Sequence, residues 1–594
     1  MCFDAALRAE ARRLFDGREE CAEDAEDAED AEERRRNLLK MTLSLMSRRA
    51  FFYQALLALL LVFTGESWAR EWIYTNTGHF EVFTNSRPRD ASVLIGRLEQ
   101  FRENFLRILP GAPFREPRVT VVIFDSERDF RPYKPLYKGK PKEDLAGVFQ
   151  GFPDEVVIAL TTEMDLEQTI PVIFHEYVHL LMHARGYRLP PWLNEGVAEL
   201  YSTITVENDQ LKLGRDIPYH LMLLNRNKLM PLSQLFSITQ SSPDYNEGTR
   251  RSLFYAQSWA LLHYWDCGLA KEPQQFARKA KFLELLQMGL PADRSMQEAF
   301  GRSLADVERD LGAYVRGGKY YMRAIKVEKV DYAARVKFEP ASDFKRDVAL
   351  ENLKWRLQQN GDATLKMLQF AEREPEAARP YELLAAMAMM DREPQRAIGY
   401  WQKAVERKSD NPYIYEQLAQ NSLRQSMHAV SLNFRLPESA AAELRGWLDR
   451  AIELSPDYAD AWDWLALTEA FSVKLRNSVV NKAIGKRELL DERPRFMAAI
   501  SLIALRIDKK ELAAQVADLL LARPDVQAVP SANNRITMDG VGAAAGGGSS
   551  WMLNREYYPD VRYIAQNIQR HLRSDKPAED DMPEPAGFEL RDAY

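Results

Sequence analysis

The chain has 594 residues, of which 46% are hydrophobic and 28% are charged, and its formal net charge is −7. This length allows two or more domains with their own cores, and the hydrophobic content is typical of globular proteins rather than disordered chains. The negative charge argues against nucleic acid as the main partner, because proteins that bind nucleic acid present basic surfaces.

Residues 1–40 form a charged tract of low complexity. Glu-Asp-Ala repeats run from Glu23 to Glu33 and are followed by Arg34–Arg36. Such a segment has little apolar surface to bury. We therefore expect either a solvated helix or a stretch that lies upstream of the true start, at Met41 or Met46.

Residues 41–69 have the organisation of an export signal. Arg48 and Arg49 precede a thirteen-residue apolar run, Phe51–Phe63, and small residues at Ser67 and Ala69 occupy the positions that a signal peptidase reads. The run is shorter than the roughly twenty residues of a membrane span. We expect cleavage after Ala69, no membrane span in the mature chain, and export to the bacterial periplasm or cell envelope.

Two alternatives remain open for this signal. The paired arginines resemble a twin-arginine signal, which suits a protein exported in the folded state, but general secretory signals also carry two arginines. If Met1 is the true start, an uncleaved anchor is the other alternative.

Cysteine is expected to have a minor role. Cys2 and Cys21 precede the expected cleavage site, so Cys267 is alone in the mature chain. An intrachain disulfide is then excluded, and a metal site has to be built from other residues.

The strongest chemical signal is the pattern His-Glu-x-x-His formed by His175, Glu176 and His179. Residues four apart project from the same face of a helix, so both imidazoles can reach one metal ion. Glu176, one step round the helix, is placed to polarise a water molecule on that ion. The alternative is a core helix with incidental histidines.

A second block favours the metal site. Residues 191–199 read Pro-Trp-Leu-Asn-Glu-Gly-Val-Ala-Glu, and the preceding Pro-Pro pair is typical of a helix start. This places Glu195 in the first turn of a second helix and Glu199 one turn later on the same face. A catalytic zinc site needs a third protein ligand of this kind and an open position for water.

Together the two blocks resemble the gluzincin metallopeptidases, the thermolysin-like group of the peptidase MA superfamily. The resemblance implies Zn²⁺ bound by His175, His179 and Glu195, with Glu199 as the outer carboxylate that orients a zinc histidine. Fifteen residues separate His179 from Glu195, a spacing similar to that of small bacterial gluzincin domains. His183 continues the histidine face, but it lies about 12 Å along the helix from His175, too far for both to bind one zinc.

Residues 70–325 are expected to form this α+β, zincin-like catalytic domain. Alternating or continuous apolar runs predict strands at His79–Thr84, Arg118–Phe124 and Val156–Leu160 and a helix at Ala91–Leu109. The zinc helix is expected to begin near Pro171 and to end at Gly186. The stretch from Ala146 to Gln150 is either an edge strand that pairs with substrate, as the resemblance implies, or a plain inner strand.

A later helix, Phe254–Leu262, carries Tyr255. The resemblance implies that the Tyr255 hydroxyl stabilises the oxyanion, and the alternative is a packed core tyrosine. The segments Ala299–Gly301 and Leu304–Tyr314 fit helices of the C-terminal lobe of such a domain.

The implied reaction is hydrolysis of peptide bonds. The zinc lowers the pKa of its bound water, Glu176 passes the proton to the leaving amine, and Tyr255 and the metal stabilise the negative charge. The Gly-x-Met-Glu-Asn segment with which one aminopeptidase family binds a free amino terminus is missing. An endopeptidase is therefore favoured over an exopeptidase.

From about residue 345 the pattern becomes all-helical. A connector is expected at residues 326–377, and residues 378–530 resemble tetratricopeptide repeats. The resemblance rests on large and small apolar residues at repeat positions: Tyr381, Leu384, Ala385, Ala397, Trp401, Ala404, Tyr415, Leu418, Ala419, Leu448, Ala451, Pro456, Trp462, Leu465 and Ala466. A degenerate last pair spans Phe496–Pro524. Such arrays present a groove to a peptide or protein partner, and the alternative is a helical brace for the catalytic domain.

Residues 531–594 are expected to be a flexible linker and tail, with one amphipathic helix at Val561–Leu572. The sequence as a whole predicts an exported zinc metalloendopeptidase whose repeats dock substrate or a partner. The alternative is a zinc-binding adaptor or scaffold protein of the cell envelope without proteolytic activity.

Overall fold

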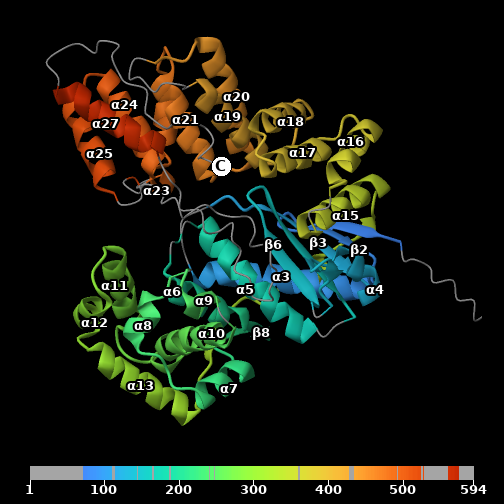
Figure 1. Ribbon diagram of the computed structural model, residues 1–594, viewed down its shortest axis with the longest axis vertical. Coiled ribbons are helices and arrows are strands. Elements are labelled where there is room, and N and C mark those ends of the chain that lie inside the picture. Colours follow the sequence, from blue (N-terminus) through green and yellow to red (C-terminus); the bar gives the residue numbers. More distant parts are fainter. Residues whose placement is uncertain are drawn as a thin grey trace, which may run out of the picture. The chain divides into compact units, whose positions relative to one another are not determined.

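A computed structural model gives the fold (Figure 1). The charged tract, the export signal with Cys2 and Cys21, and the predicted linker lie outside the described residues. No described helix combines the length and apolar character that crossing a membrane requires. The described ranges are residues 71–109, 114–143, 145–163, 166–185, 187, 189–239, 241–246, 248–358, 361–426, 434–490, 493–523, 526 and 559–573.

A six-stranded mixed sheet forms the N-terminal part, with the order β11-β1-β2-β3-β7-β6. Neighbours β2, β3 and β7 run parallel, and the remaining neighbours are antiparallel. The strand β6 ends the sheet, which confirms an edge strand where Ala146–Gln150 was the candidate. The strands are β1 (Ile73–Asn76), β2 (Glu81–Thr84), β3 (Arg118–Phe124), β6 (Gly147–Gly151), β7 (Glu155–Thr161) and β11 (Glu339–Pro340).

Successive side chains of β3 point to opposite faces of the sheet and pack in two different cores. Val121 and Ile123 pack in the main core with the helices α3 (Pro88–Ile108) and α5 (Leu166–Ala184). Val122 and Phe124 point to the other face. Since both faces are buried, the run Val121–Phe124 is continuously apolar instead of alternating with polar residues.

The helix α5 differs from its predicted bounds. It begins five residues before Pro171, which therefore lies inside the helix. Pro171 is the sixth residue of the helix, past the first turn, so the backbone hydrogen bond that this position would donate to Glu167 is missing. The helix ends at Ala184, and the predicted end at Gly186 is outside the described residues.

A helical layer follows α5, together with a small sheet of order β10-β9-β8. Its interior is built around Trp192, Trp259 and Trp265, each at most 1% exposed. Gly301 ends α12 in the left-handed conformation, where a residue without a Cβ is favoured. The elements are α6 (Pro191–Ser202), β8 (Thr205–Glu207), β9 (Gln210–Leu213), α7 (Pro218–Arg226), α8 (Leu232–Ser237), α9 (Pro243–Asn246), α10 (Gly248–His263), η2 (Tyr264–Gly268), α11 (Gln275–Gln287), α12 (Ala292–Phe300), α13 (Leu304–Gly317) and β10 (Arg323–Lys326).

The stretch 326–377, predicted as a helical connector, also completes the sheet. Its strand β11 pairs with β1, and the short helix α14 (Tyr332–Arg335) packs on α3. That packing is close, because a Cβ on Gly96 would lie 2.7 Å from the backbone nitrogen of Ala333. A two-residue strand has too little pattern to be recognised from sequence.

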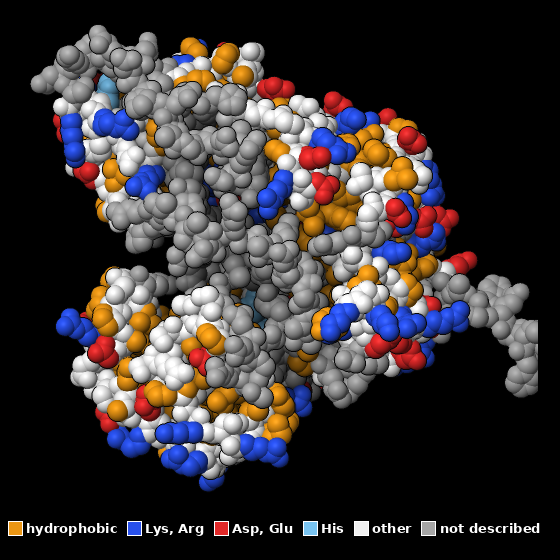
Figure 2. All heavy atoms as spheres, in the orientation of Figure 1, with side chains coloured by type: hydrophobic (Ala, Val, Ile, Leu, Met, Phe, Trp, Pro, Cys, Tyr) orange, Lys and Arg blue, Asp and Glu red, His pale blue; other side chains and the backbone are white. Residues whose placement is uncertain are grey.

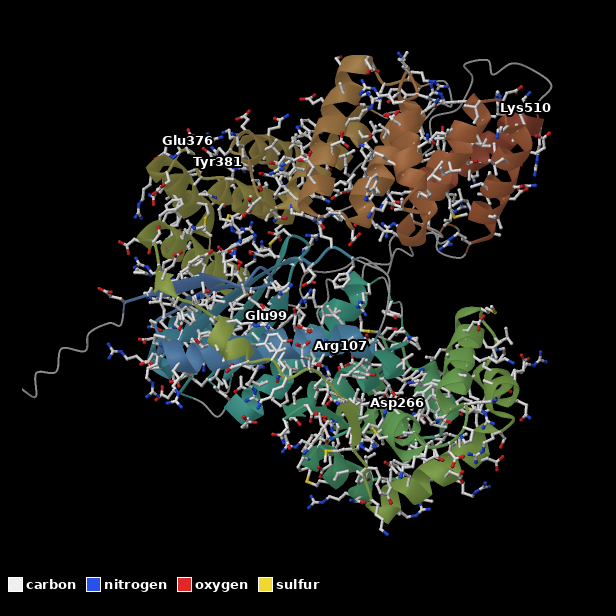
Figure 3. The ribbon with its side chains drawn as sticks, turned by 180° about the vertical axis from the view of Figure 1, so that it is seen from behind. Glu99, Arg107, Asp266, Glu376, Tyr381 and Lys510 are labelled. Carbon is white, nitrogen blue, oxygen red and sulfur yellow. The ribbon has the colours of Figure 1, made fainter. Side chains whose placement is uncertain are left out.

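Every described element after β11 is a helix, and we call residues 343–573 the helical array. The predicted repeat positions Leu384, Ala397 and Trp401 are at most 1% exposed, whereas Tyr381, labelled in Figure 3, is partly exposed and lies under Arg407. The helices are α15 (Asp343–Gln358), α16 (Ala363–Arg373), α17 (Arg379–Met390), α18 (Pro394–Glu406), α19 (Pro412–Ser426), α20 (Glu438–Leu454), α21 (Ala459–Phe471), α22 (Asn477–Ile484), α23 (Arg487–Leu490), α24 (Pro494–Arg506), α25 (Lys510–Ala522) and α27 (Pro559–Arg573).

The last of these helices, α27, confirms the amphipathic helix predicted at Val561–Leu572. Its residues Val561, Ile564 and Ile568 are fully buried against α24 and α25. The helix therefore covers an apolar face at the end of the array, as a terminal cap does in repeat proteins.

The array begins as part of the core under the sheet. Leu353 and Leu357 of α15 pack with Val122, Phe124 and Val157 on the second face. The first helix of the array thus buries apolar strand residues that would otherwise face water.

Buried ion pairs join the same elements. Arg356 of α15 bonds to Asp154 and lies 3.3 Å from Glu155 at the start of β7. Glu155 also accepts hydrogen bonds from Asn352, at 2.6 Å, and from Arg379 of α17. Burial alone would raise the pKa of Glu155, but Arg379 and Arg356 outweigh it and lower the pKa to about 2, so the carboxylate is ionised in a buried site.

A second contact lies at the start of β3. The Arg115 guanidinium lies over the rings of Tyr413 and Tyr458, at 5.5 and 4.7 Å from their centroids. Arg118 pairs with Asp410 of the array. Through these contacts the helices α15, α17, α19 and the start of α21 hold the α+β part directly.

We predict that Arg356→Ala destabilises the protein by about 3–5 kcal/mol, because it leaves two buried carboxylates with too few partners. Thermal and urea unfolding followed by circular dichroism measure this change. The matched control is Arg396→Ala. Arg396 forms an exposed pair with Glu393, and its loss should change stability by about 0.5 kcal/mol or less. Basic and acidic side chains are interspersed over the face of the molecule drawn in Figure 2. Equal effects of the two substitutions would contradict the prediction.

Candidate metal centre

The histidine pair and Glu195 come together from two neighbouring helices. His175 and His179 lie one turn apart on α5, and Glu195 lies on α6, which packs against α5. Glu195 is the fifth residue of α6, just past the first turn in which the sequence placed it. The three side chains form the one His/Cys/Asp/Glu group among the described residues that is arranged to hold a metal ion.

The distances between the donor atoms fit one ion. The Nε2 atoms of His175 and His179 lie 3.1 Å apart, and Glu195 Oε2 lies 3.4 and 3.3 Å from them. Ligand atoms about 2.0–2.1 Å from a tetrahedral zinc are separated by about 3.3 Å from one another. The site therefore has three of the four corners of a tetrahedron, with the fourth left for another ligand.

Burial supports the same interpretation. The side chains of His179 and Glu195 are 2% and 1% exposed, and that of His175 is 12% exposed. Glu195 Oε2 is buried and has no hydrogen-bond partner among the described residues. A buried carboxylate oxygen without a donor is costly, and a cation at this position would remove that cost.

Glu199 lies one turn after Glu195, as predicted, and faces His175 from outside. Its Oε1 lies 3.6 Å from His175 Nδ1, and its Oε2 lies 3.0 Å from His220 Nε2. A carboxylate on the outer nitrogen fixes the orientation of a metal-binding imidazole and increases its basicity. His220, on α7, was not singled out from the sequence, because a lone histidine far from the motif carries no spacing signal.

The three carboxylates around His175 decide its charge when no metal is bound. Burial alone would lower the pKa of His175, but Glu199, Glu195 and Glu176 raise it to about 9. The histidines in turn lower the pKa of Glu195, against the effect of burial. The site therefore stabilises positive charge within a ring of acidic groups.

The predicted catalytic residues Glu176 and Tyr255 lie beside this group. Glu176 is 6% exposed and close enough to raise the pKa of both His175 and Tyr245. The Tyr255 ring stacks on the His175 ring, with centroids 6.2 Å apart. Tyr255 is the eighth residue of α10 and not at its head, so it enters the site from the middle of a buried helix.

Tyr245 was missed by the sequence analysis. It lies on the four-residue helix α9, and its hydroxyl donates a hydrogen bond of 2.8 Å to Glu195 Oε1. The segment before α10 is polar, with no motif or periodicity that would separate Tyr245 from an ordinary loop tyrosine. Only the fold brings it to the metal ligand.

Two residues considered earlier are outside the group. His183 is partly exposed and is not part of the metal-binding cluster, as its spacing predicted. Cys267 is buried as a free thiol, and burial raises its pKa to about 12, so it is neither a thiolate nor a ligand here.

Gly196 explains how α6 reaches its position. A Cβ at this residue would lie 2.8 Å from the carbonyl oxygen of Ser258 and 3.1 Å from Leu262, both on α10. The absence of a side chain therefore lets α6 and α10 pack closely. This packing brings Glu195 on one helix near Tyr255 on the other.

The chain matches no known protein-family model, and a search of curated proteins finds no match. The assignment of the site therefore depends on its geometry. Two imidazoles, one carboxylate, an adjacent acid and two tyrosines can together bind a divalent cation and carry out acid–base chemistry on a ligand at its open position.

We predict that Gly196→Ala weakens zinc binding and destabilises the protein by about 1–3 kcal/mol, because the new methyl group forces α6 away from α10. Isothermal titration calorimetry with Zn²⁺ and thermal unfolding measure the two effects. The control is Gly446→Ala on α20, where no atom lies within 4 Å of the added Cβ. Unchanged zinc affinity in Gly196→Ala would show that helix packing does not position Glu195.

Proposed function

We propose that the protein is an exported, zinc-dependent metalloendopeptidase of the gluzincin type, active in the periplasm or cell envelope. The observation that carries this proposal is the convergence of His175, His179 and Glu195 within 3.1–3.4 Å of one another, with Glu176 next to His175 in the chain. Three protein ligands and a free corner are the arrangement of catalytic zinc, whereas structural zinc sites use four protein ligands.

His175, His179 and Glu195 would hold the metal, and Glu199 would orient His175. When bound, zinc supplies Lewis acidity that lowers the pKa of a water molecule toward neutrality. Glu176 would accept a proton from the water that attacks the peptide carbonyl and would then donate it to the leaving amine. The Tyr255 hydroxyl donates to the oxygen that becomes negatively charged.

The edge position of strand β6 supports the proposal that the substrate is a peptide. Among the described strands β6 pairs only with β7, so we propose that its other edge offers backbone groups to an extended chain. Phe149 of this strand lies 6.3 Å, between ring centroids, from Tyr177 of α5. Strand pairing along β6 would thus lay a peptide beside the helix that carries the histidines, and such pairing does not require a free chain end.

The array is proposed to resemble tetratricopeptide repeats and to dock a protein substrate or partner. One observation favours a second role for the array, as a brace that supports the α+β part. The contacts of Arg115, Arg118 and Arg356 join the sheet to the first helices of the array. Docking of a partner is then assigned to the later helices, from the body of α21 onward.

A zinc-binding adaptor without proteolytic activity is the main alternative. It needs the same metal ligands but no general base. Loss of the base therefore separates an enzyme from an adaptor, provided that metal binding is measured in the same sample.

We predict that Glu176→Gln lowers peptide hydrolysis by about 10²–10⁴-fold, because the amide cannot accept the proton of the attacking water. Zinc content, measured by mass spectrometry of the purified protein, should stay at one ion per chain. Removal of the metal with a chelator should abolish the wild-type activity, and added Zn²⁺ should restore it. The substrate is a proteome-derived peptide library.

The matched control is Glu195→Gln, which should lose both zinc and activity because a ligand is removed. If Glu176→Gln keeps zinc and cleaves the library as fast as the wild type, the adaptor is the correct interpretation. Comparison of the cell-envelope proteomes of wild-type and Glu176→Gln strains then identifies physiological substrates.

We also predict cleavage within peptides whose amino terminus is acetylated and whose carboxyl terminus is amidated. Backbone pairing along β6 recognises internal segments, so blocked and free forms of one peptide should be hydrolysed at similar rates. Mass spectrometry of the products locates the cut. Hydrolysis of only the free forms, one residue at a time, would assign the protein to the exopeptidases.

A further inference from the structure

The two carboxylate oxygens of Glu195 have different surroundings. Oε1 accepts a hydrogen bond from the Tyr245 hydroxyl at 2.8 Å. Oε2 lies between the two histidine Nε2 atoms and has no hydrogen-bond partner among the described residues. One oxygen is therefore occupied by a protein donor, and only the other is directed at the metal position.

Aromatic packing holds Tyr245 in this place. Its ring lies 5.7 Å from Phe254 in an edge-to-face arrangement and 6.3 Å from Tyr255, measured between centroids.

The Tyr245 hydroxyl and Glu195 Oε1 lie 2.8 Å apart, and of these two groups the phenol supplies the proton of the hydrogen bond. A protonated phenol in contact with a carboxylate has one proton to give, and Glu195 Oε1 receives it.

The number of Glu195 oxygens that bind the metal determines how many coordination positions are left for water. With one oxygen bound, two imidazoles and a carboxylate fill three corners and leave one for water. A carboxylate that binds through both oxygens takes a further position and competes with that water.

We propose that Tyr245 is a positioning residue that restricts Glu195 to binding the metal through one oxygen and so keeps a coordination position open. This inference rests on the proposed metal site and concerns the geometry of its third ligand. Tyr245 acts through Glu195 and does not touch the metal or the substrate.

The test uses the full chain loaded with Co²⁺ in place of zinc, because the visible absorption of Co²⁺ reports the coordination number. The wild type should show the intense bands of a four-coordinate ion. Tyr245→Phe keeps the ring and removes the donor, so its bands should weaken toward the five-coordinate pattern. Its kcat/KM on the peptide library should fall by about 10–100-fold, as is usual when the outer partner of a metal ligand is lost.

Two control variants separate this role from other effects. Tyr255→Phe removes the proposed oxyanion donor and should lower kcat while the Co²⁺ spectrum stays four-coordinate. Tyr219→Phe, at a tyrosine that is 55% exposed on α7, should change neither measurement.

Each outcome decides the inference. A spectrum of Tyr245→Phe identical to that of an active, four-coordinate wild type would falsify the role of Tyr245 while the proposed function stands. A wild type that binds neither Co²⁺ nor Zn²⁺ overturns the metal site itself and this inference with it. Weakened bands together with reduced hydrolysis support both.

Discussion

The close contact between α6 and α10 is the constraint on which the candidate site depends. Gly196 brings the two helices together without a side chain between them, and the residue before it is the third candidate ligand. From this contact follow the approach of Glu195 to the histidines of α5 and the placement of Tyr255 beside His175. A longer separation of the helices would leave a buried carboxylate without a counter-charge, which a folded protein rarely tolerates.

Buried charges at two places in this protein have different surroundings. At the candidate metal centre, two imidazoles and Glu195 surround a position suited to a cation, and the nearest described polar atoms to Glu195 Oε2 are the histidine Nε2 atoms at 3.3–3.4 Å. At the junction with the array, Glu155 is satisfied by Asn352, Arg356 and Arg379. The first arrangement places one carboxylate oxygen between two imidazole nitrogens, whereas in the second both oxygens of Glu155 accept hydrogen bonds from side chains. This difference separates a candidate functional site from a structural ion-pair network.

The array shares its core with the sheet and is therefore more than an attached module. Leu353 and Leu357 cover strand residues that would otherwise be exposed, and Arg115 reaches the tyrosines of the array. Among the described strands the same sheet ends at β6, which packs beside α5. Two proposed roles are therefore compatible. The array braces one face of the sheet, and a peptide pairs along β6 at the end of the sheet, so the two roles use different surfaces.

Sequence alone determined the features that depend on local spacing. The strand at Arg118–Phe124, the histidine pair one helical turn apart and the all-helical second half follow from periodicity, which the chain carries residue by residue. Tertiary structure decided the rest: the edge position of β6, the sharing of α15 with the sheet, and the contacts of Tyr245 and His220 with the site. These contacts join residues far apart in the chain, and no local pattern records which distant side chain a buried carboxylate will meet.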